Sequence, residues 1–498
     1  MAMDIKQAKQ EIENTLRAYL AKDEMGNYVI PSVRQRPVLL MGPPGIGKTQ
    51  IMEQIAQEMG VGLVAYTITH HTRQSAVGLP FIEHREYDGE EVAITEYTMS
   101  EILASVYNLM EKTGIREGIL FLDEINCVSE TLAPMMLQFL QCKTFGNRSV
   151  TEGWLICTAG KPPEYNRSVR DFDVVTLDRV KRIDVTEDFA AWKEYALAKG
   201  LHGAVVSYLD IKKENFYRIE NTVDGLRFAT ARGWEDLSEL IFVYEKLGIR
   251  VSREVVEQYI QMPEIAKDFA AYLDLYYKYQ TTYRIGDILN GNWERVTVSA
   301  LARAPFDEKL SVMGILYSRL AEAAGEVRVA DELADDVFAD LKKFQAGTVE
   351  LDALLEDRIR QMKNAKDAGQ LGRPQQVRKQ KEIAALEDFV ATLAAAEPAP
   401  ADREAAVDLI RPQFLAITES REHLADETSQ KFDHVFRYLE EAFGQGQEMV
   451  IFVTEITAGK AASWFVENFG CDAYYRHNKE LLFDDTRRRI AEEMKQAL

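Results

Sequence analysis

The stretch Gly42-Pro43-Pro44-Gly45-Ile46-Gly47-Lys48-Thr49 fits the pattern G-x-x-x-x-G-K-[ST], the phosphate-binding P-loop. Residues 37–41 before it form a short apolar run typical of a buried strand, and residues 49–59 after it carry apolar side chains at helical spacing. Glycines let backbone N–H groups turn toward a polyphosphate, and the N-terminus of the following helix adds partial positive charge. We therefore expect a strand, a nucleotide-binding loop and a helix, rather than a simple Gly-Pro turn.

The expected ligand of this loop is ATP with Mg²⁺. The Lys48 side chain would reach the β- and γ-phosphates, and the Thr49 hydroxyl would bind the metal. One acid from a later motif, Asp123, completes the predicted binding set. That set is Gly42, Pro43, Pro44, Gly45, Ile46, Gly47, Lys48, Thr49, Gln50 and Asp123, with Thr49 and Asp123 as the metal ligands.

The later motif is an apolar run at residues 119–122 that ends in Asp123-Glu124. A buried strand would deliver both carboxylates to its C-terminal edge, where ligands bind in open parallel sheets. Asp123 would bind Mg²⁺ through water, and Glu124 would orient and deprotonate the attacking water. An Asp-Glu pair is weak evidence by itself, but downstream of a P-loop it becomes strong.

The rest of the chain predicts an α/β core followed by helices. Four further strands are expected at 61–68, 118–123, 154–158 and 180–185, with hairpins turning near 88–89 and 146–147. Strands alternating with helices indicate a three-layer α/β fold with a parallel sheet. The predicted domains are a core with an N-terminal helix at 1–190, a helical lid at 191–300, and an all-α extension at 301–498.

Within the helical part, residues 252–344 suggest a series of short helices. The aromatic residues at 269–279 favour core packing over nucleobase stacking. A long helical hairpin is expected at about 350–445, with a proline-containing turn at 397–402. The aromatic side chains at 465–475 could fold back onto the base of this hairpin, and residues 483–497 look able to pack as well.

Charge and hydropathy limit the function classes. The 498 residues include 59 basic and 80 acidic ones, giving a formal charge of −21, which disfavours a general nucleic-acid motor. The first residues contain no apolar signal-peptide region, and the apolar run 449–453 is far too short to span a bilayer. We expect a cytoplasmic protein with no membrane span.

The chain resembles the AAA+ ATPases and, within them, the MoxR-like group of the helix-2-insert clade. The resemblance covers about residues 30–250, and no function can be transferred from it to the remaining half. It is carried by GPPGIGKT at 42–49, LDEIN at 122–126, PPEYN at 162–166, LDR at 177–179, TAR at 230–232, and the hairpin near 88–89.

This resemblance implies further site residues. Arg179 occupies the position of the arginine finger, which acts on the ATP of a neighbouring subunit, and Arg232 lies at the sensor 2 position. Arg167, Arg170 and Arg182 are nearby alternatives to Arg179. A guanidinium at the γ-phosphate neutralises developing charge and can contribute about 10³–10⁵ in rate. A finger supplied in trans implies a homo-oligomeric ring, usually a hexamer.

One position departs from the group's pattern. MoxR-like proteins usually have Asn before the Pro that follows the sensor 1 strand, and here that residue is Lys161. A lysine cannot accept a hydrogen bond, and it places a mobile cation near the γ-phosphate. Lys161 is therefore a candidate catalytic-site residue that would slow hydrolysis unless it points away.

The resemblance implies an ATP-hydrolysing, chaperone-like remodeller that matures or activates a protein client, often a von Willebrand factor A domain protein. Two alternatives stay open. A nucleotide-gated assembly scaffold with weak hydrolysis is motivated by Lys161, whereas a McrB-like nucleic-acid motor conflicts with the net charge of −21.

Overall fold

The computed structural model describes residues 2–70, 78–87, 90–145, 148–165, 169, 172–222, 225–367, 373–397 and 400–479. Its contacts divide the chain into two compact units. The first comprises residues 1–191 and 357–376, and the second comprises residues 192–356 and 377–498. The predicted boundary at residue 190 lies beside this division, and the predicted boundary at residue 300 lies inside the second unit.

Five parallel strands form the sheet of the first unit, in the order β2-β5-β8-β1-β9. Their bounds are β1 Val38–Met41, β2 Gly62–Thr67, β5 Gly118–Asp123, β8 Trp154–Gly160 and β9 Lys181–Asp184. Met41 lies opposite Gly160, and Thr67 lies opposite Asp123. The expected parallel sheet is confirmed. The carboxyl ends of these strands share one edge, which collects the polar residues that follow each strand.

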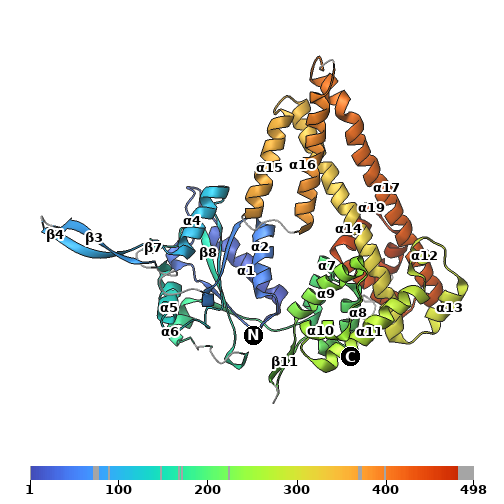
Figure 1. Ribbon diagram of the computed structural model, residues 1–498, viewed down its shortest axis with the longest axis horizontal. Helices are drawn as coiled ribbons and strands as arrows, with labels where there is room; N and C mark the ends of the chain where they lie inside the picture. Colours follow the sequence, from blue (N-terminus) through green and yellow to red (C-terminus); the bar gives the residue numbers. More distant parts are fainter. Residues whose placement is uncertain are drawn as a thin grey trace, which may run out of the picture. The chain divides into compact units, whose positions relative to one another are not determined.

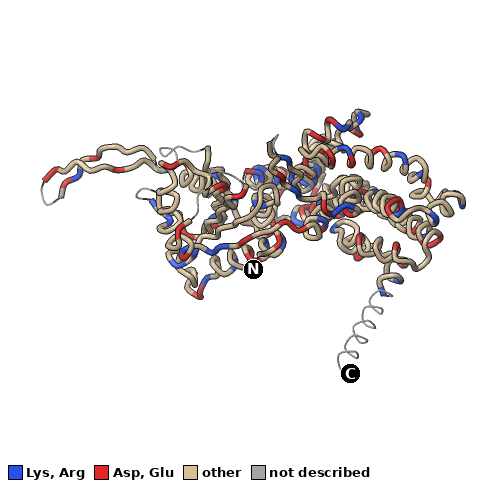
Figure 2. Tube along the Cα trace, turned by 90° about the horizontal axis from the view of Figure 1, so that it is seen from below, with Lys and Arg blue, Asp and Glu red and all other residues tan. Residues whose placement is uncertain are grey.

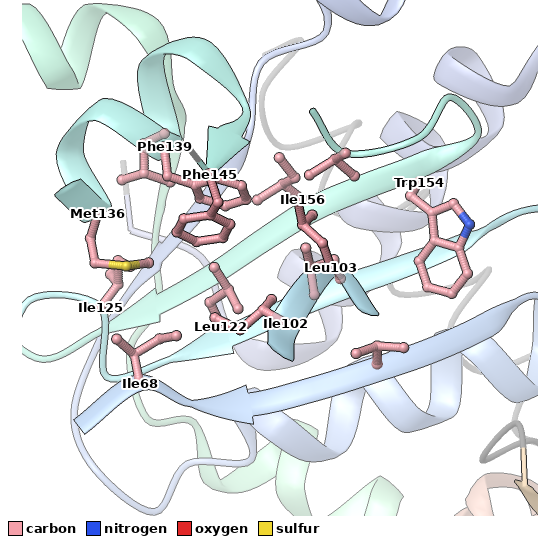
Figure 3. Packing of buried hydrophobic residues seen from close by; sticks show 14 of the residues in the cluster. Ile68, Ile102, Leu103, Leu122, Ile125, Met136, Phe139, Phe145, Trp154 and Ile156 are labelled. Carbon is pink, nitrogen blue, oxygen red and sulfur yellow. The ribbon is translucent and has the colours of Figure 1, made fainter. Parts of the chain in front are cut away.

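Helices cover both faces of this sheet. Their bounds are α1 Ile5–Leu20, α2 Lys48–Met59, α4 Glu101–Thr113, α5 Ala133–Cys142 and α6 Val174–Arg179, with short 3₁₀ turns η1 Ser32–Arg34, η2 Ile68–His70 and η3 Pro163–Tyr165. Side chains alternate across a strand, so Leu120 and Leu122 face α4 and α5, while Phe121 faces the opposite side. On the first side, the Phe139 and Phe145 rings stack at 4.0 Å (Figure 3). The three-layer α/β architecture is confirmed.

A two-stranded antiparallel ribbon, β3 Pro80–Tyr87 with β4 Glu90–Tyr97, extends away from the sheet (Figure 1). Its side chains include exposed apolar groups, among which Ile82 is 71% exposed. Acidic residues lie along both strands (Figure 2). A smaller ribbon joins β6 Thr144–Phe145 to β7 Arg148–Ser149. Both expected hairpins are confirmed, although the turn residues 88–89 and 146–147 lie outside the described part of the chain.

The second unit is mainly helical. Three helices, α7 Phe189–Lys199, α15 Leu351–Asp367 and α16 Arg373–Ala394, contain residues of both units. The others are α8 Gly203–Ile211, α9 Ala231–Leu247, α10 Arg253–Tyr259, α11 Pro263–Thr282, α12 Ile285–Leu289, α13 Arg295–Arg303, α14 Phe306–Gln345, α17 Arg403–Phe443, α18 Gln447–Ala458 and α19 Lys460–Phe469. A 3₁₀ turn, η4 Lys213–Asn215, follows α8. Buried rings of Tyr208, Trp234 and Phe269 pack together, which confirms that the aromatic stretch at 269–279 serves the core.

Two expectations about this unit were wrong. Residues 306–345 form one helix of 40 residues rather than short helices. Gly314 does not break this helix, because α8 packs closely there: a Cβ at Gly314 would lie 3.2 Å from the Ser207 Cβ. The second error concerns the region after residue 188, which is not wholly helical. It contains an antiparallel ribbon, β10 Arg218–Thr222 with β11 Gly225–Ala229.

The break between α16 and α17 lies where the proline-containing turn was expected, although residues 398–399 of that segment lie outside the described part of the chain. Asp402 begins α17 by accepting a hydrogen bond from the Ala405 N–H at 2.9 Å. Apolar side chains of α14, α15, α16 and α17 share one core, and α15 is a further helix that the hairpin prediction did not separate. Phe465 stacks on Phe432 of α17, as expected, whereas residues 483–497 lie outside the described part of the chain.

Among the described residues, no single helix combines the length and hydropathy of a membrane span. Helices α18 and α19 together have the length and the composition of a membrane span, but the chain bends by 90° between them. Phe452 of α18 and Phe465 of α19 are fully buried within the protein.

Candidate functional site

The P-loop connects the end of β1 to the start of α2, at the carboxyl edge of the sheet. Gly47 has a φ of 94°, a left-handed conformation that an L side chain rarely adopts, and α2 begins at the next residue. At Gly42, a Cβ would lie 2.5 Å from the Val185 carbonyl oxygen. These two glycines are therefore required by the backbone path, and the loop reaches the helix N-terminus in the way the motif predicts.

The Lys48 side chain is folded back over this loop. It is only 7% exposed, and its ammonium donates hydrogen bonds to the carbonyl oxygens of Gly42 at 2.9 Å and Pro43 at 2.6 Å. An ammonium held by backbone carbonyls is positioned without the entropy cost of ordering a free side chain. The cation expected at the phosphates is thus fixed inside the loop.

Thr49 and Asp123 join the two motifs. The Thr49 hydroxyl donates to the Asp123 Oδ2 atom at 3.0 Å, and the Glu124 N–H donates to the Asp123 Oδ1 atom at 2.8 Å. Asp123 ends β5, which is separated from β1 by β8 in the sheet. The structure therefore brings together two residues that lie 74 positions apart in the sequence.

The Thr49 and Asp123 oxygens fit a magnesium ion. Mg²⁺ prefers hard oxygen ligands at about 2.1 Å in octahedral geometry, so neighbouring ligands lie about 3.0 Å apart. The observed distance between the two oxygens is 3.0 Å. Thr49 and Asp123 would hold the ion directly or through its water, and the ion would neutralise phosphate charge there.

Glu124 directly follows Asp123 and has an unusual backbone. Its φ is 58°, in the left-handed region that non-glycine residues seldom occupy. The carboxylate is held on both oxygens, because Oε2 accepts a hydrogen bond from the Thr69 hydroxyl at 3.1 Å and Oε1 forms an ion pair with the Lys161 ammonium. The side chain remains 27% exposed. The predicted base and the sensor 1 lysine therefore meet at one carboxylate.

Lys161 follows the last residue of β8, and Asn126 fixes its backbone. The Asn126 side chain donates to the Lys161 carbonyl oxygen at 2.8 Å and accepts from the Lys161 N–H at 3.1 Å. Asn126 is buried, with 3% of its surface exposed. The Lys161 side chain points toward Glu124. The alternative, that it points away from the site, is therefore wrong.

Arg179 is the last residue of α6, on the surface of the first unit. Its guanidinium donates to the Gln141 Oε1 atom of α5 at 3.0 Å, so its hydrogen-bond partner among the described residues is a neutral amide outside the P-loop. The alternative Arg182 is paired with Asp184 at 2.8 Å. Arg167 and Arg170 lie outside the described residues.

Arg232 lies in the first turn of α9, in the second unit. Thr230 caps this helix by accepting a hydrogen bond from the Gly233 N–H at 3.2 Å. Burial and the neighbouring Glu235 raise the pKa of Asp236, and the Arg232 guanidinium opposes that shift. Arg232 thus has an acidic neighbour one turn along its own helix, and its role toward a nucleotide remains a prediction.

Sequence reasoning missed two residues of this site. Thr69 received no role from the sequence, yet its hydroxyl holds Glu124. Asn126 was part of the LDEIN motif but received no role, although it fixes Lys161. A polar residue two positions after the strand-end acids was the available signal for Asn126.

A comparison with protein-family models agrees with the motifs. Residues 38–175 match the family model described as "ATPase family associated with various cellular activities (AAA)". Among solved structures, the chain is similar to the crystal structure of NtrX from Brucella abortus in complex with ADP, at 18% identity and a TM-score of 0.24. That alignment covers 41% of this chain and 44% of the NtrX chain, so it spans less than half of either. The comparison with curated proteins gave no match.

Proposed function

We propose that this chain, whose residues 38–175 match the AAA family, is a Mg²⁺-dependent ATPase that works as a ring and remodels or activates partner proteins. The AAA domain indicates an ATP-binding protein. The observation that carries the ATPase proposal is the 3.0 Å hydrogen bond between Thr49 and Asp123, because it places a metal-binding hydroxyl and carboxylate together beside the buried Lys48.

Each residue has a role in the proposed reaction. Backbone N–H groups of the loop and the Lys48 ammonium bind the phosphates, while Thr49 and Asp123 hold the magnesium ion. Glu124 accepts the proton of a water that attacks the terminal phosphate. Thr69 and Lys161 also hold this carboxylate, so they share its acceptor sites with the water.

The ring is proposed from the surface around Arg179. Val174 and Val175 of the same short helix are 81% and 53% exposed, which is unusual for valine. Exposed apolar residues beside a guanidinium fit a subunit interface. Arg179 is the preferred finger because it bonds a neutral amide, whereas Arg182 already has a carboxylate partner.

The proposed client is a protein, and a von Willebrand factor A domain protein is the specific candidate. The acidic β3–β4 ribbon with its exposed Phe81 and Ile82 supports a role in protein contact, since acidic side chains repel nucleic acids. A hexameric, MoxR-like assembly is the proposed form of the active protein.

Steady-state hydrolysis tests the ATPase proposal. ATP turnover should rise with protein concentration as subunits assemble, and Glu124→Gln should lower kcat by about 10²–10⁴ while ATP still binds. If the wild type and the Glu124→Gln variant hydrolyse ATP at the same rate at every protein concentration, the proposal that Glu124 catalyses hydrolysis is wrong.

The ion pair between Lys161 and Glu124 favours a second candidate, a nucleotide-gated scaffold with weak hydrolysis. In that case ATP would change the assembly state, measured by light scattering, and the Glu124→Gln protein would hydrolyse ATP as slowly as the wild type. The two measurements together separate the remodeller from the scaffold.

A further inference from the structure

The environment of Glu124 points to a control of hydrolysis within the active site. We propose that Lys161 is a positioning residue: its ammonium holds the Glu124 carboxylate until the terminal phosphate of ATP attracts it, and it returns to Glu124 once that phosphate has left. The inference rests on the proposed function, because it requires ATP at the P-loop and Glu124 as the base.

Glu124 is held in this arrangement from several directions. Its left-handed backbone, with a φ of 58°, is strained and persists only where neighbours determine it. Those neighbours include the Asp123 carboxylate, which accepts the Glu124 N–H, and the Ala159 carbonyl of β8, which accepts the Ile125 N–H at 3.0 Å. The backbone of Glu124 is therefore fixed, and the contacts of its carboxylate decide whether an oxygen is available to a water.

The Oε1 atom of Glu124, which pairs with Lys161, is the oxygen whose contacts decide the availability of the base. A base must accept a hydrogen bond from the water whose proton it takes. Lys161 occupies Oε1 with a charge-assisted bond, which is about twice as strong as a neutral one, and Thr69 occupies Oε2 with a neutral bond. Release of Lys161 thus frees more of the carboxylate than release of Thr69 would.

Lys161 is also placed next to the P-loop. Gly160, the residue before it, lies opposite Met41 in the sheet, and the Gly42 N–H donates to the Gly160 carbonyl oxygen at 3.4 Å. Asn126 holds the Lys161 backbone, so the four-carbon side chain is the part able to move. The side chain is 24% exposed, which leaves it room to do so.

Charge supplies the driving force for the exchange. A carboxylate carries one negative charge, whereas a terminal phosphate group carries about two and is a common partner of lysine. The γ-phosphate lies where water attacks beside Glu124, so the ammonium moves to it when ATP is present and returns to Glu124 when ADP, which lacks this group, remains. Two consequences follow: Lys161 leaves Glu124 only beside ATP, and Lys161 makes the protein prefer ATP over ADP.

Zero-length carbodiimide cross-linking of the wild-type protein tests the exchange directly, because it joins only lysine and carboxylate groups in contact. Cross-linked peptides are quantified by mass spectrometry without nucleotide, with MgADP, and with Mg²⁺ and a non-hydrolysable ATP analogue. The Lys161–Glu124 product should fall at least tenfold with the analogue alone. The exposed pair Lys9–Glu58, at 2.7 Å in the same unit, is the internal control and should give a constant yield.

Calorimetric titration of the same samples separates two kinds of failure. If the analogue binds and the Lys161–Glu124 yield stays constant, the role of Lys161 is overturned while the ATP-binding function stands. If the analogue does not bind, the proposed function fails and this inference falls with it.

A pair of variants gives an independent test. Lys161→Met should lower the preference for the analogue over ADP about tenfold, which is about 1.4 kcal/mol. Lys9→Met should leave this preference unchanged, because Lys9 pairs with Glu13 of α1 and Glu58 of α2, away from the P-loop. Equal preferences in the two variants would overturn the proposal.

Discussion

The two units of this protein use polar side chains in different ways. In the first unit, Glu124 and Lys161 meet at a strand edge and each remains about a quarter exposed. In the second unit, Lys193 lies between Asp210 at 3.1 Å and Glu455 at 2.9 Å, and these side chains are 13–19% exposed. The comparison teaches that an ion pair at a strand end stays available to a ligand, whereas one between packed helices serves the scaffold.

Burial makes the scaffold pair costly to disturb. It raises the pKa of the Glu455 carboxyl, and the Lys193 ammonium opposes this shift. The pair also joins α7 to α18, which are more than 250 residues apart in sequence. We therefore expect a change at the Glu124–Lys161 pair to affect nucleotide chemistry, and a change at Lys193 to affect stability.

The largest effect expected for a single substitution is that of Arg179→Ala, because a guanidinium at the terminal phosphate contributes about 10³–10⁵ in rate. ATP hydrolysis should fall by this factor with little change in ATP affinity. If the arginine acts on a neighbouring subunit, mixing Arg179→Ala with Glu124→Gln subunits should restore part of the activity. Failure to recover in rings shown to be mixed would contradict action in trans.

The next effect is on stability and sharpens the contrast between the units. Lys193→Met should destabilise the second unit by about 3–5 kcal/mol, because it leaves Asp210 and Glu455 without their buried cation. Urea unfolding followed by tryptophan fluorescence measures this loss. The exposed pair Arg250–Asp274 is the control, since Arg250→Met should cost less than about 1 kcal/mol.

The third prediction concerns ATP affinity. Lys48→Ala removes the ammonium that the loop carbonyls hold, so ATP should bind roughly 100-fold more weakly, or about 2.7 kcal/mol. Isothermal titration calorimetry measures the change, and circular dichroism checks that the fold is kept. An ATP affinity equal to that of the wild type would refute the P-loop assignment.

The smallest effect is expected on the β3–β4 ribbon. Ile82→Ser should change the free energy of unfolding by less than about 0.5 kcal/mol, because the side chain is 71% exposed. Ile102, which is fully buried in the core of the same unit, is the matched control, and Ile102→Ala should cost about 2–5 kcal/mol. A large loss at Ile82 would mean that the ribbon contributes to the stability of the fold.

Much of the first unit could be predicted because its signals are local. A P-loop needs glycines at fixed spacing, and a buried strand that ends in Asp123-Glu124 identifies its own polar edge. The ribbon β10–β11 was missed because its two strands have only five residues each and lie between stretches with helical spacing. The single helix α14 was missed because its apolar residues face different partners along its length.

The sequence by itself determined the nucleotide-binding loop, the strand-end acids, the parallel α/β core and the proline-containing turn between α16 and α17, since each follows from residues close together in the chain. Only the tertiary structure decided that Lys161 pairs with Glu124 and that Asn126 fixes Lys161. It also decided that α17 continues through Pro412, between the buried Ile410 and the Phe414 ring stacked on Phe338. These contacts join residues from separate elements, and packing sets their energy rather than local propensity.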